Sequence, residues 1–296
     1  MARRGVAMAS RQQIKRRIGS VKNTKQITRA MQLVAASKLR HAQEAVVRPR
    51  AYAELARGIL TRLRQLAADA QEFKLFNARP VKARMVIVIT SDLGLAGAYD
   101  ANVIRQLITQ ATEDQAKGVK TTVIAVGRKA AQATSHIKGL DAEAVYPAMS
   151  DHPTADKLRP ILNSAVNLFG EGAVDEVDII YTKFISSIRQ EVQVQKLLPA
   201  GFEETELDED LAHADVEPSA EALLHAATLR LLEAQIYQAF LEAIASEQSM
   251  RMLAMKNATD NASDLIDDLT LEYNNARQAA ITQELAEITG GAEAMK

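Results

Sequence analysis

The stretch between Pro218 and Gly290 contains neither proline nor glycine, and it constrains the fold more than any other part of the chain. Apolar and small residues recur through it at spacings that alternate between three and four, over roughly eight heptads, where three or four already indicate a coiled coil. These positions are Leu224, Ala227, Leu231, Ala234, Gln238, Leu241, Ala245, Gln248, Met252, Met255, Thr259, Ala262, Ile266, Leu269, Tyr273, Ala276 and Ala280. At 1.5 Å per residue the predicted helix is roughly 100 Å long, which exceeds the width of an ordinary globular domain.

The N-terminal stretch offers a partner for this helix. Alanines in the seam allow a second helix to approach closely, and the Gln and Thr positions fix its register. A comparable stripe is formed by Ile14, Ile18, Val21, Thr28, Met31, Ala35, Leu39 and Ala42. Ser10 is the predicted N-cap of this first helix. Pro49 is expected to kink or end it, with helix resuming over 51–68.

The middle of the chain has a different pattern. Runs rich in β-branched residues occupy 84–90, 121–126, 176–184 and 191–198, and helical segments occupy 102–117, 127–137 and 155–169. The first two runs are nearly continuous in Val and Ile, as in strands covered on both faces, whereas the last alternates like an edge strand. The alternation of strands and helices predicts a small Rossmann-like, mostly parallel α/β domain.

The predicted fold class is therefore α/β plus a long antiparallel α-helical coiled coil. The α/β domain is inserted between the terminal helices and returns the chain to where it left, so the two helices run antiparallel. The predicted segments are 1–79 for the N-terminal helix, 80–200 for the α/β domain, 201–218 for an acidic linker, and 219–296 for the C-terminal helix.

Charge is distributed unevenly although the net charge is only −1. From Arg3 to Arg40 there are basic residues and no carboxylate, and the first acid is Glu44. Residues 203–217 are rich in Asp and Glu and contain no Lys or Arg. Such asymmetry indicates separate surfaces for different partners.

Several classes of protein are disfavoured by composition. The chain has no cysteine, which removes disulfides and thiolate sites and fits a reducing compartment. No apolar run approaches the ~20 residues that span a bilayer. The Arg-rich start also resembles an organellar transit peptide, but its helical pattern continues unbroken into 26–39, which argues against removal.

The search for chemistry gives one candidate, the glycine-containing turn from Ser91 to Asp100 between a predicted strand and helix. Such a turn is able to bind phosphate on helix N–H groups, but this one lacks the spacing of a dinucleotide or P-loop motif. A tight β–α turn is the favoured interpretation. The histidines show no metal-binding spacing. No catalytic, cofactor-binding or metal-binding residue is therefore predicted.

The basic N-terminal helix has three interpretations: a solvated face, a nucleic-acid arm, or a surface that faces acidic protein loops. No aromatic residue precedes Tyr52 to stack on bases, which disfavours nucleic acid. Exposed ion pairs contribute only ~0.2–1 kcal/mol each, so contacts between such a surface and acidic loops form and break readily. Two other classes stay open: a coiled-coil nucleic-acid or cytoskeletal tether, and a small nucleotide-dependent enzyme.

Several segments carry a resemblance to one family. They are residues 17–31 and 34–38, the turn at 91–100, residues 245–248 and 255–262, and residues 281–292 preceded by 276–278. Together they resemble the gamma subunits of bacterial and organellar F-type ATP synthases. The central turn departs from the family, since Leu93, Ala96 and Asp100 stand where Arg or Lys, Cys and Asn are usual.

The resemblance implies a central-stalk rotor without catalytic residues of its own. Its terminal helices would enter an alpha3beta3 hexamer, and its α/β domain would dock on the epsilon subunit and the c-ring. It implies no cofactor and no nucleic acid. The expected location is the cytoplasmic face of the bacterial inner membrane, reached indirectly through the c-ring.

The resemblance also implies contact residues. Those expected to contact the beta subunit are Lys22, Lys25, Arg29, Met31, Arg277, Gln278 and Thr282. An apolar bearing is expected at Ile281, Leu285 and Ile288, and a foot near the c-ring at Val216 and Glu217.

Overall fold

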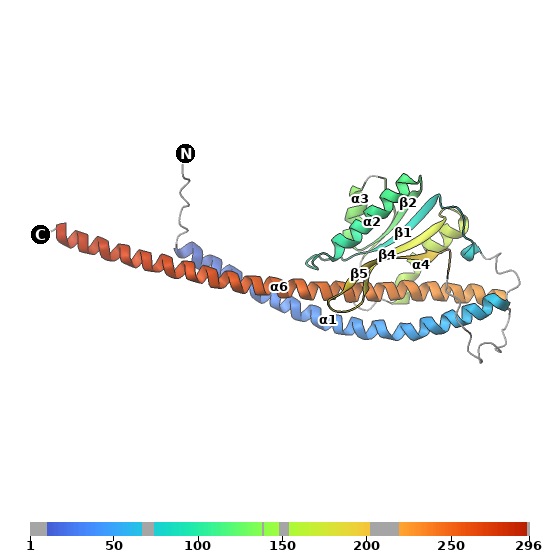
Figure 1. Cartoon of the computed structure of the whole chain (residues 1–296), viewed down its shortest axis with the longest axis horizontal. Helices are drawn as coiled ribbons and strands as arrows, with labels where there is room; N and C mark the ends of the chain where they lie inside the picture. The colour runs from blue at the N-terminus through green and yellow to red at the C-terminus, as the bar shows by residue number, and fades with distance from the viewer. Residues whose placement is uncertain (1–10, 67–73, 138, 148–153, 202–218, 295–296) are drawn as a thin grey trace. The chain divides into compact units, whose positions relative to one another are not determined.

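The computed structural model describes residues 11–66, 74–137, 139–147, 154–201 and 219–294 (Figure 1). In chain order the elements are α1 (Arg11–Leu66), the 3-10 turn η2 (Lys74–Phe76), β1 (Ala83–Ile89), α2 (Tyr99–Ala116), β2 (Lys120–Val126), α3 (Arg128–His136), β3 (Asp141–Tyr146), α4 (Ala155–Glu171), β4 (Glu176–Phe184), β5 (Gln190–Leu198) and α6 (Ala220–Ala294). They form two compact units. The helical unit contains 11–34 and 252–294, and the sheet unit contains the described residues from 35 to 251.

The sheet has the strand order β3-β2-β1-β4-β5. Strand β1 pairs in parallel with both β2 and β4, and β2 pairs in parallel with β3. Strand β5 pairs antiparallel with β4 and lies at the edge. The predictions of a mostly parallel sheet and of an edge strand at its end are both confirmed.

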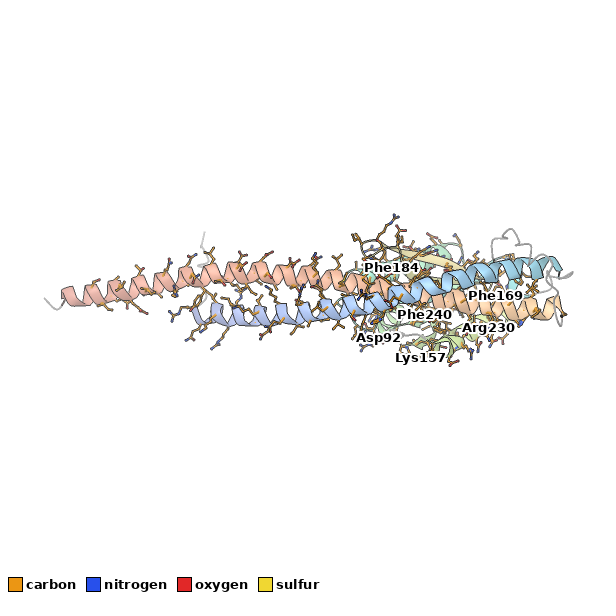
Figure 2. All side chains as sticks on the ribbon, turned by 90° about the horizontal axis from the view of Figure 1, so that it is seen from below. Asp92, Lys157, Phe169, Phe184, Arg230 and Phe240 are labelled. Atoms are coloured by element: carbon orange, nitrogen blue, oxygen red, sulfur yellow. The ribbon has the colours of Figure 1, made fainter. Side chains whose placement is uncertain are left out.

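Burial in β1 alternates between the two faces of the sheet, as the period of two in a strand requires. One cluster of buried residues contains Met85, Ile87, Ile89, Phe169 of α4 and Phe240 of α6 (Figure 2). The other contains Val86, Val88, Val103, Leu107 and Ala130, from β1, α2 and α3. The near-continuous Val and Ile run in β1 therefore reflects a strand with helices on both sides, as predicted.

Helix α6 is buried from both sides where it belongs to the sheet unit. Its side chains at 241–246 are all buried, since one face packs on the sheet and α1 lies along the helix (Figure 1). Hydroxyl groups also attach it to the β4–β5 hairpin: Ser246 Oγ donates to the Thr182 carbonyl at 3.0 Å, and Ser249 Oγ donates to the Ser187 carbonyl at 2.8 Å. Burying nearly every side of a helix fixes its rotation about its own axis.

In the helical unit, residues 11–34 of α1 lie antiparallel to residues 252–294 of α6 (Figure 1). The hydroxyl oxygens of Thr28 and Thr259 are 2.8 Å apart across the pair and form a buried hydrogen bond. Every seam position predicted from the two stripes is buried or half-buried, across both units. The prediction of an antiparallel helix pair is confirmed.

The seam ends where the sequence pattern ends. Ala280 is the last half-buried position of α6, and the side chains from 281 to 290 are all exposed. Helix α1 begins at Arg11, so this last part of α6 extends past its partner (Figure 1). The end of α6 is therefore a single helix without a described packing partner.

Two local predictions differ from the structure. Helix α1 continues through Pro49 to Leu66, so an end of the helix at that residue is wrong, because helix on both sides outweighs the one hydrogen bond that proline removes. Strand β3 was not predicted, because it is an exposed edge strand without an apolar run. The proposed N-cap Ser10 lies outside the described residues.

The division of the chain at residues 79, 200 and 218 remains a prediction. It separates the chain by type of element, whereas the compact units each combine parts of both long helices. The acidic segment 202–218 lies outside the described residues.

The close approach at Gly127 gives a stability test. Gly127 has φ +92°, and a Cβ there would lie 2.4 Å from the Thr90 carbonyl oxygen. Gly127→Ala is therefore expected to lower the free energy of unfolding by about 3 kcal/mol or more, measured by urea denaturation. Gly118 is the matched control, because its φ is +72° with no atom within 4 Å of an added Cβ. Gly118→Ala should cost only about 1 kcal/mol, and equal losses would contradict the role of the contact.

Candidate functional site

The turn between β1 and α2 is filled by its own side chains. Asp100, in the first turn of α2, accepts a hydrogen bond from the backbone N–H of Ser91 at 2.9 Å. The Ser91 hydroxyl lies 2.8 Å from the other Asp100 oxygen. A carboxylate in the first turn of the helix thus places negative charge near the site where a phosphate would bind. The geometry supports the tight-turn interpretation.

A charged cluster lies at the opposite edge of the sheet, where the parallel strands begin. Arg84 forms ion pairs with Glu176 and Asp178 on β4, and its Nε lies 3.0 Å from Asp114 Oδ2. Lys196 on β5 adds a contact to Glu176 at 2.7 Å. Burial raises the pKa of Asp178, while the positive charge of Arg84 opposes that rise. The cluster joins β1, β4, β5 and α2, and we interpret it as structural.

A second ion pair fixes the chain just before β1. Asp175 accepts hydrogen bonds from the backbone N–H groups of Lys82 and Ala83, at 2.8 and 3.0 Å, and from Arg79 Nε at 2.5 Å. Arg79 also lies over the ring of Phe169, 4.7 Å from its centroid. Burial acts to raise the pKa of Asp175, but these donors outweigh it and hold the pKa below its usual value.

A polar patch lies inside the contact between β4 and α6. The buried Glu242 carboxylate accepts a hydrogen bond from Gln238 Nε2 at 2.7 Å. Burial, with the nearby charge of Glu242, raises the pKa of the Tyr181 phenol. Tyr181 and Glu242 are at most 5% exposed, so a substrate cannot reach either side chain.

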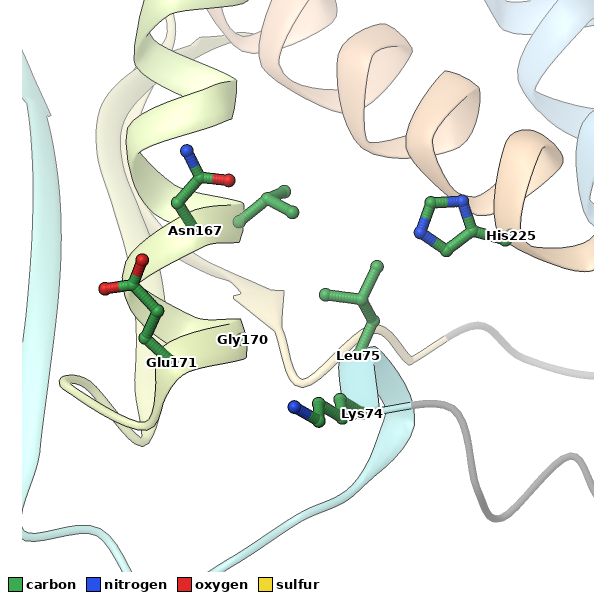
Figure 3. Close-up of a pocket in the computed structure, with 7 residues that line it drawn as sticks. Lys74, Leu75, Asn167, Gly170, Glu171 and His225 are labelled. Carbon is green, nitrogen blue, oxygen red and sulfur yellow. The ribbon is translucent and has the colours of Figure 1, made fainter.

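One hollow in the sheet unit lies between α4, η2 and the start of α6 (Figure 3). It is lined by Lys74, Leu75, Val166, Asn167, Gly170, Glu171 and His225. Lys74, Glu171 and His225 come from three different elements and stand apart around the hollow (Figure 3), an arrangement without a nucleophile next to a base. Across the described part of the chain, no group of three or more His, Asp or Glu residues is placed to hold a metal ion. Nor is any described helix long and apolar enough to cross a membrane.

The predicted beta-contact residues of α1 lie in the helical unit and are accessible. Lys22 and Arg29 are exposed, Lys25 is half-buried, and Met31 is a half-buried position of the seam itself. Arg29 donates to the side-chain oxygen of Gln32 at 3.0 Å. The structure therefore presents their basic groups on the outside of the helix pair.

The predicted contact residues of α6 are accessible as well. Arg277, Gln278 and Thr282 are exposed, and the Thr282 hydroxyl donates to the Gln278 carbonyl at 3.0 Å. The bearing residues Ile281, Leu285 and Ile288 are 46%, 58% and 68% exposed, respectively. Large apolar side chains with this exposure indicate a surface that another protein covers. Val216 and Glu217 lie outside the described residues.

The two helices of the helical unit carry opposite charge. The charged residues that α1 contributes are Arg11, Lys15, Arg16, Arg17, Lys22, Lys25 and Arg29, with no carboxylate among them. Helix α6 contributes an acidic face of Asp260, Asp264, Asp267, Asp268 and Glu272. Within the described part of this unit no ion pair joins the two helices, so both sets of charges face solvent.

Comparison with known proteins decides the family. A family model described as ATP synthase matches residues 10–295. The ATP synthase gamma chain of Stenotrophomonas maltophilia is 39% identical over 292 residues, covering 97% of this chain and all of that protein. The gamma chain of Moorella thermoacetica is 41% identical over 289 residues, covering 98% of this chain and all of that one. The chain belongs to the ATP synthase gamma chain family.

Solved structures agree with the gamma-chain assignment. A chain from the central stalk and c-ring structure of the Tetrahymena thermophila mitochondrial ATP synthase superposes with a TM-score of 0.59 at 27% identity. That match covers 78% of this chain and 99% of the other. A chain of the Euglena gracilis mitochondrial ATP synthase superposes with a TM-score of 0.66 over 96% of this chain and 94% of the other. Its identity of 19% makes this second likeness one of fold alone.

Sequence reasoning about this gamma-chain family member missed the two ion-pair groups. A signal was present, since Arg84 opens the apolar run of β1 and Asp178 interrupts that of β4. A charge within a buried run indicates a partner, because an unpaired buried charge is costly. The identity of the partner followed only from the register of β1 on β4, which pairs Arg84 with Glu176.

The pKa of Asp175 gives a test of pH dependence. Its folded-state pKa is lowered, so its contribution to stability is present above the usual carboxyl pKa and is lost as pH falls through the folded value. Asp175→Asn should lower the free energy of unfolding at pH 7 by about 1–3 kcal/mol, measured by urea denaturation. The difference from wild type should shrink below about pH 4. Exposed Asp156 is the control position, and a difference that is constant with pH would contradict the assignment.

Proposed function

We propose that this chain is the central-stalk rotor of a proton-translocating F-type ATP synthase. The observation that carries the proposal is the continuity of α6, a single helix of 75 residues. Its first part is buried against the sheet, and its second part pairs with α1. One uninterrupted helix thus contributes residues to both compact units, and in this proposal it carries torque from the sheet unit to the helix pair.

The mechanism that we propose is mechanical. The alpha3beta3 hexamer surrounds the helix pair, and each beta subunit meets a different side of it at any moment. Because α1 is basic and α6 carries an acidic face, the sides of the shaft differ in their free energy of contact. Rotation therefore changes the relative stability of the conformations of each beta subunit, which is a shift between existing states.

Proton flow through the membrane supplies the drive in this mechanism. One charge that crosses 100 mV releases about 2.3 kcal/mol, so several charges are needed for each ATP. In reverse, ATP hydrolysis turns the shaft and pumps protons. The bond chemistry belongs to the beta subunits, and this chain contributes no catalytic residue and no cofactor. Asp100, whose carboxylate lies in the first turn of α2 near the site where a phosphate would bind, supports this assignment.

The contact residues keep their proposed roles. Lys22, Lys25, Arg29 and Met31 contact the beta subunit from α1, and Arg277, Gln278 and Thr282 contact it from α6. Ile281, Leu285 and Ile288 form the apolar bearing at the end of α6, and Val216 and Glu217 form the foot near the c-ring. The exposure of the described members supports these roles, because a contact residue must be accessible in the isolated chain.

We further propose that the sheet unit docks on the epsilon subunit and the c-ring at the cytoplasmic face of a bacterial inner membrane. The similar gamma chains from Stenotrophomonas maltophilia and Moorella thermoacetica support a bacterial source. Attachment to the membrane is then indirect, through the c-ring.

Capture of the tagged chain from its native membrane tests the proposal. We expect alpha, beta, epsilon and c subunits to co-purify in a complex that hydrolyses ATP. Binding of DNA in their place, weakened steeply by salt, would support the nucleic-acid tether instead. Tight binding of a nucleotide by the isolated chain would support an enzyme and contradict the rotor.

Arg277 gives a sharper test, since it is exposed on α6 and assigned to the beta contact. Arg277→Ala should lower ATP turnover by about tenfold, the effect of losing roughly 1.4 kcal/mol from an interaction made during the cycle. Assembly, followed by co-purification, should stay intact. Lys256→Ala is the matched control, because Lys256 is an exposed cation of the same helix without an assigned contact. Equal turnover in both variants would remove Arg277 from the contact.

A further inference from the structure

The loop between β1 and α2 holds an unusual conformation. Leu95 has φ 66°, and no other described residue apart from glycine has a positive φ. A bulky side chain in this region is strained, and such a conformation persists only where surrounding contacts impose it. The loop also presents Leu93 and Leu95 to solvent, with 66% and 62% of each side chain exposed.

Both ends of the loop are fixed by hydrogen bonds. Ser91 is held by the Asp100 carboxylate, as described above. Asp92 accepts from the backbone N–H of Arg128 at 2.8 Å, and the Arg128 guanidinium donates to the Asp92 carbonyl at 3.0 Å. Inside the loop, the Ser91 hydroxyl also lies 2.6 Å from the Leu93 carbonyl oxygen. A second element holds the tip, from Leu93 to Leu95, from outside the loop.

That element is α6. Arg251 Nη2 donates to the carbonyl of Leu93 at 3.1 Å and to that of Gly94 at 3.4 Å. Arg251 Nη1 lies 2.7 Å from Glu247 Oε1, one helical turn earlier. The Arg251 and Glu247 side chains are only 10% and 16% exposed, so the pair is largely shielded from solvent. A planar guanidinium is able to serve a carboxylate and two carbonyls at once, which an ammonium group cannot do with the same geometry.

Tyr99 completes the arrangement. It is the first residue of α2 and is almost fully buried, and burial, with the nearby charge of Glu247, raises the pKa of its phenol. The α6 pair thus contacts the loop tip and lies near the first residue of α2. Arg251 is also the last residue of α6 that belongs to the sheet unit.

We propose that Arg251 is a positioning residue, and that its bonds to Glu247, Leu93 and Gly94 form a latch that holds the β1–α2 loop to α6. The inference rests on the proposed rotor function, and it adds a route by which torque passes from the sheet unit into α6. The bonds reach the loop tip, so rotation of α6 about its axis displaces the loop and is resisted by it. Without the latch, the β1–α2 loop and α6 move more easily relative to each other.

The first test measures the latch in the purified full-length chain. Arg251→Met removes all N–H donors of the side chain. Arg251→Lys keeps the positive charge beside Glu247 but loses the planar guanidinium that bonds several acceptors at once. In both, amide hydrogen exchange over 91–99 should be about tenfold faster or more, since hydrogen bonds to a charged donor are lost. Arg230→Met is the matched control, because Arg230 is another α6 arginine, bound to Glu233 at 2.7 Å. Unchanged exchange in Arg251→Lys would overturn the latch.

The second test uses the assembled membrane complex that carries each variant. The number of protons pumped per ATP hydrolysed should fall by about twofold in Arg251→Met and stay at the wild-type value in Arg230→Met, because a looser contact between the β1–α2 loop and α6 lets hydrolysis proceed without full rotation of the shaft. Wild-type coupling in Arg251→Met would overturn the proposal and leave the rotor function standing. A wild-type complex that lacks this chain would instead overturn the rotor function.

Discussion

The structure depends on one helix being packed in two different ways along its length. In the sheet unit α6 is enclosed by the sheet, α4 and α1, so nearly every side chain from 239 to 246 is buried. In the helical unit only the seam is buried, and the remaining faces meet solvent. The helix is continuous through both parts, but only in the first is it enclosed from several sides. Small residues make this possible, since alanine and serine allow close approach from several sides at once.

The surface of the helical unit is organised by charge. Close packing at Thr28 and Thr259 sets the register of the two helices, and no described ion pair joins them. The basic residues of α1 and the acidic face of α6 therefore remain available to other chains. Exposed charges form weak contacts that exchange readily. A shaft with a large apolar surface would instead bind its partners strongly in one orientation. The charge pattern gives the two sides of the pair different preferences without a deep energy minimum.

Most of the architecture could be predicted from the sequence, because periodicity reports burial directly. The seam from Leu224 to Ala280 identified a packed face of α6. The continuous Val and Ile run of β1 identified a strand that is covered on both faces. Strand β3 could not be found, since an exposed edge strand has no apolar pattern to read. The latch at Arg251 was equally hidden, because its partners Leu93 and Gly94 contribute backbone carbonyls, which any residue possesses. The contact residues were predicted from resemblance, because exposed charges on a helix carry no periodic signal that names a partner.

The bare end of α6 has a consequence for when this helix reaches its full stability. A short helix without a partner is marginal in water, and its turns fray when nothing packs against them. Residues 281–290 form the exposed end of the long helix α6, and three of their large apolar side chains are open to solvent. The end of α6 is helical in the free chain, and partner subunits that cover its apolar side chains would stabilise it further. The end of α6 therefore gains its full stability only after those subunits have bound.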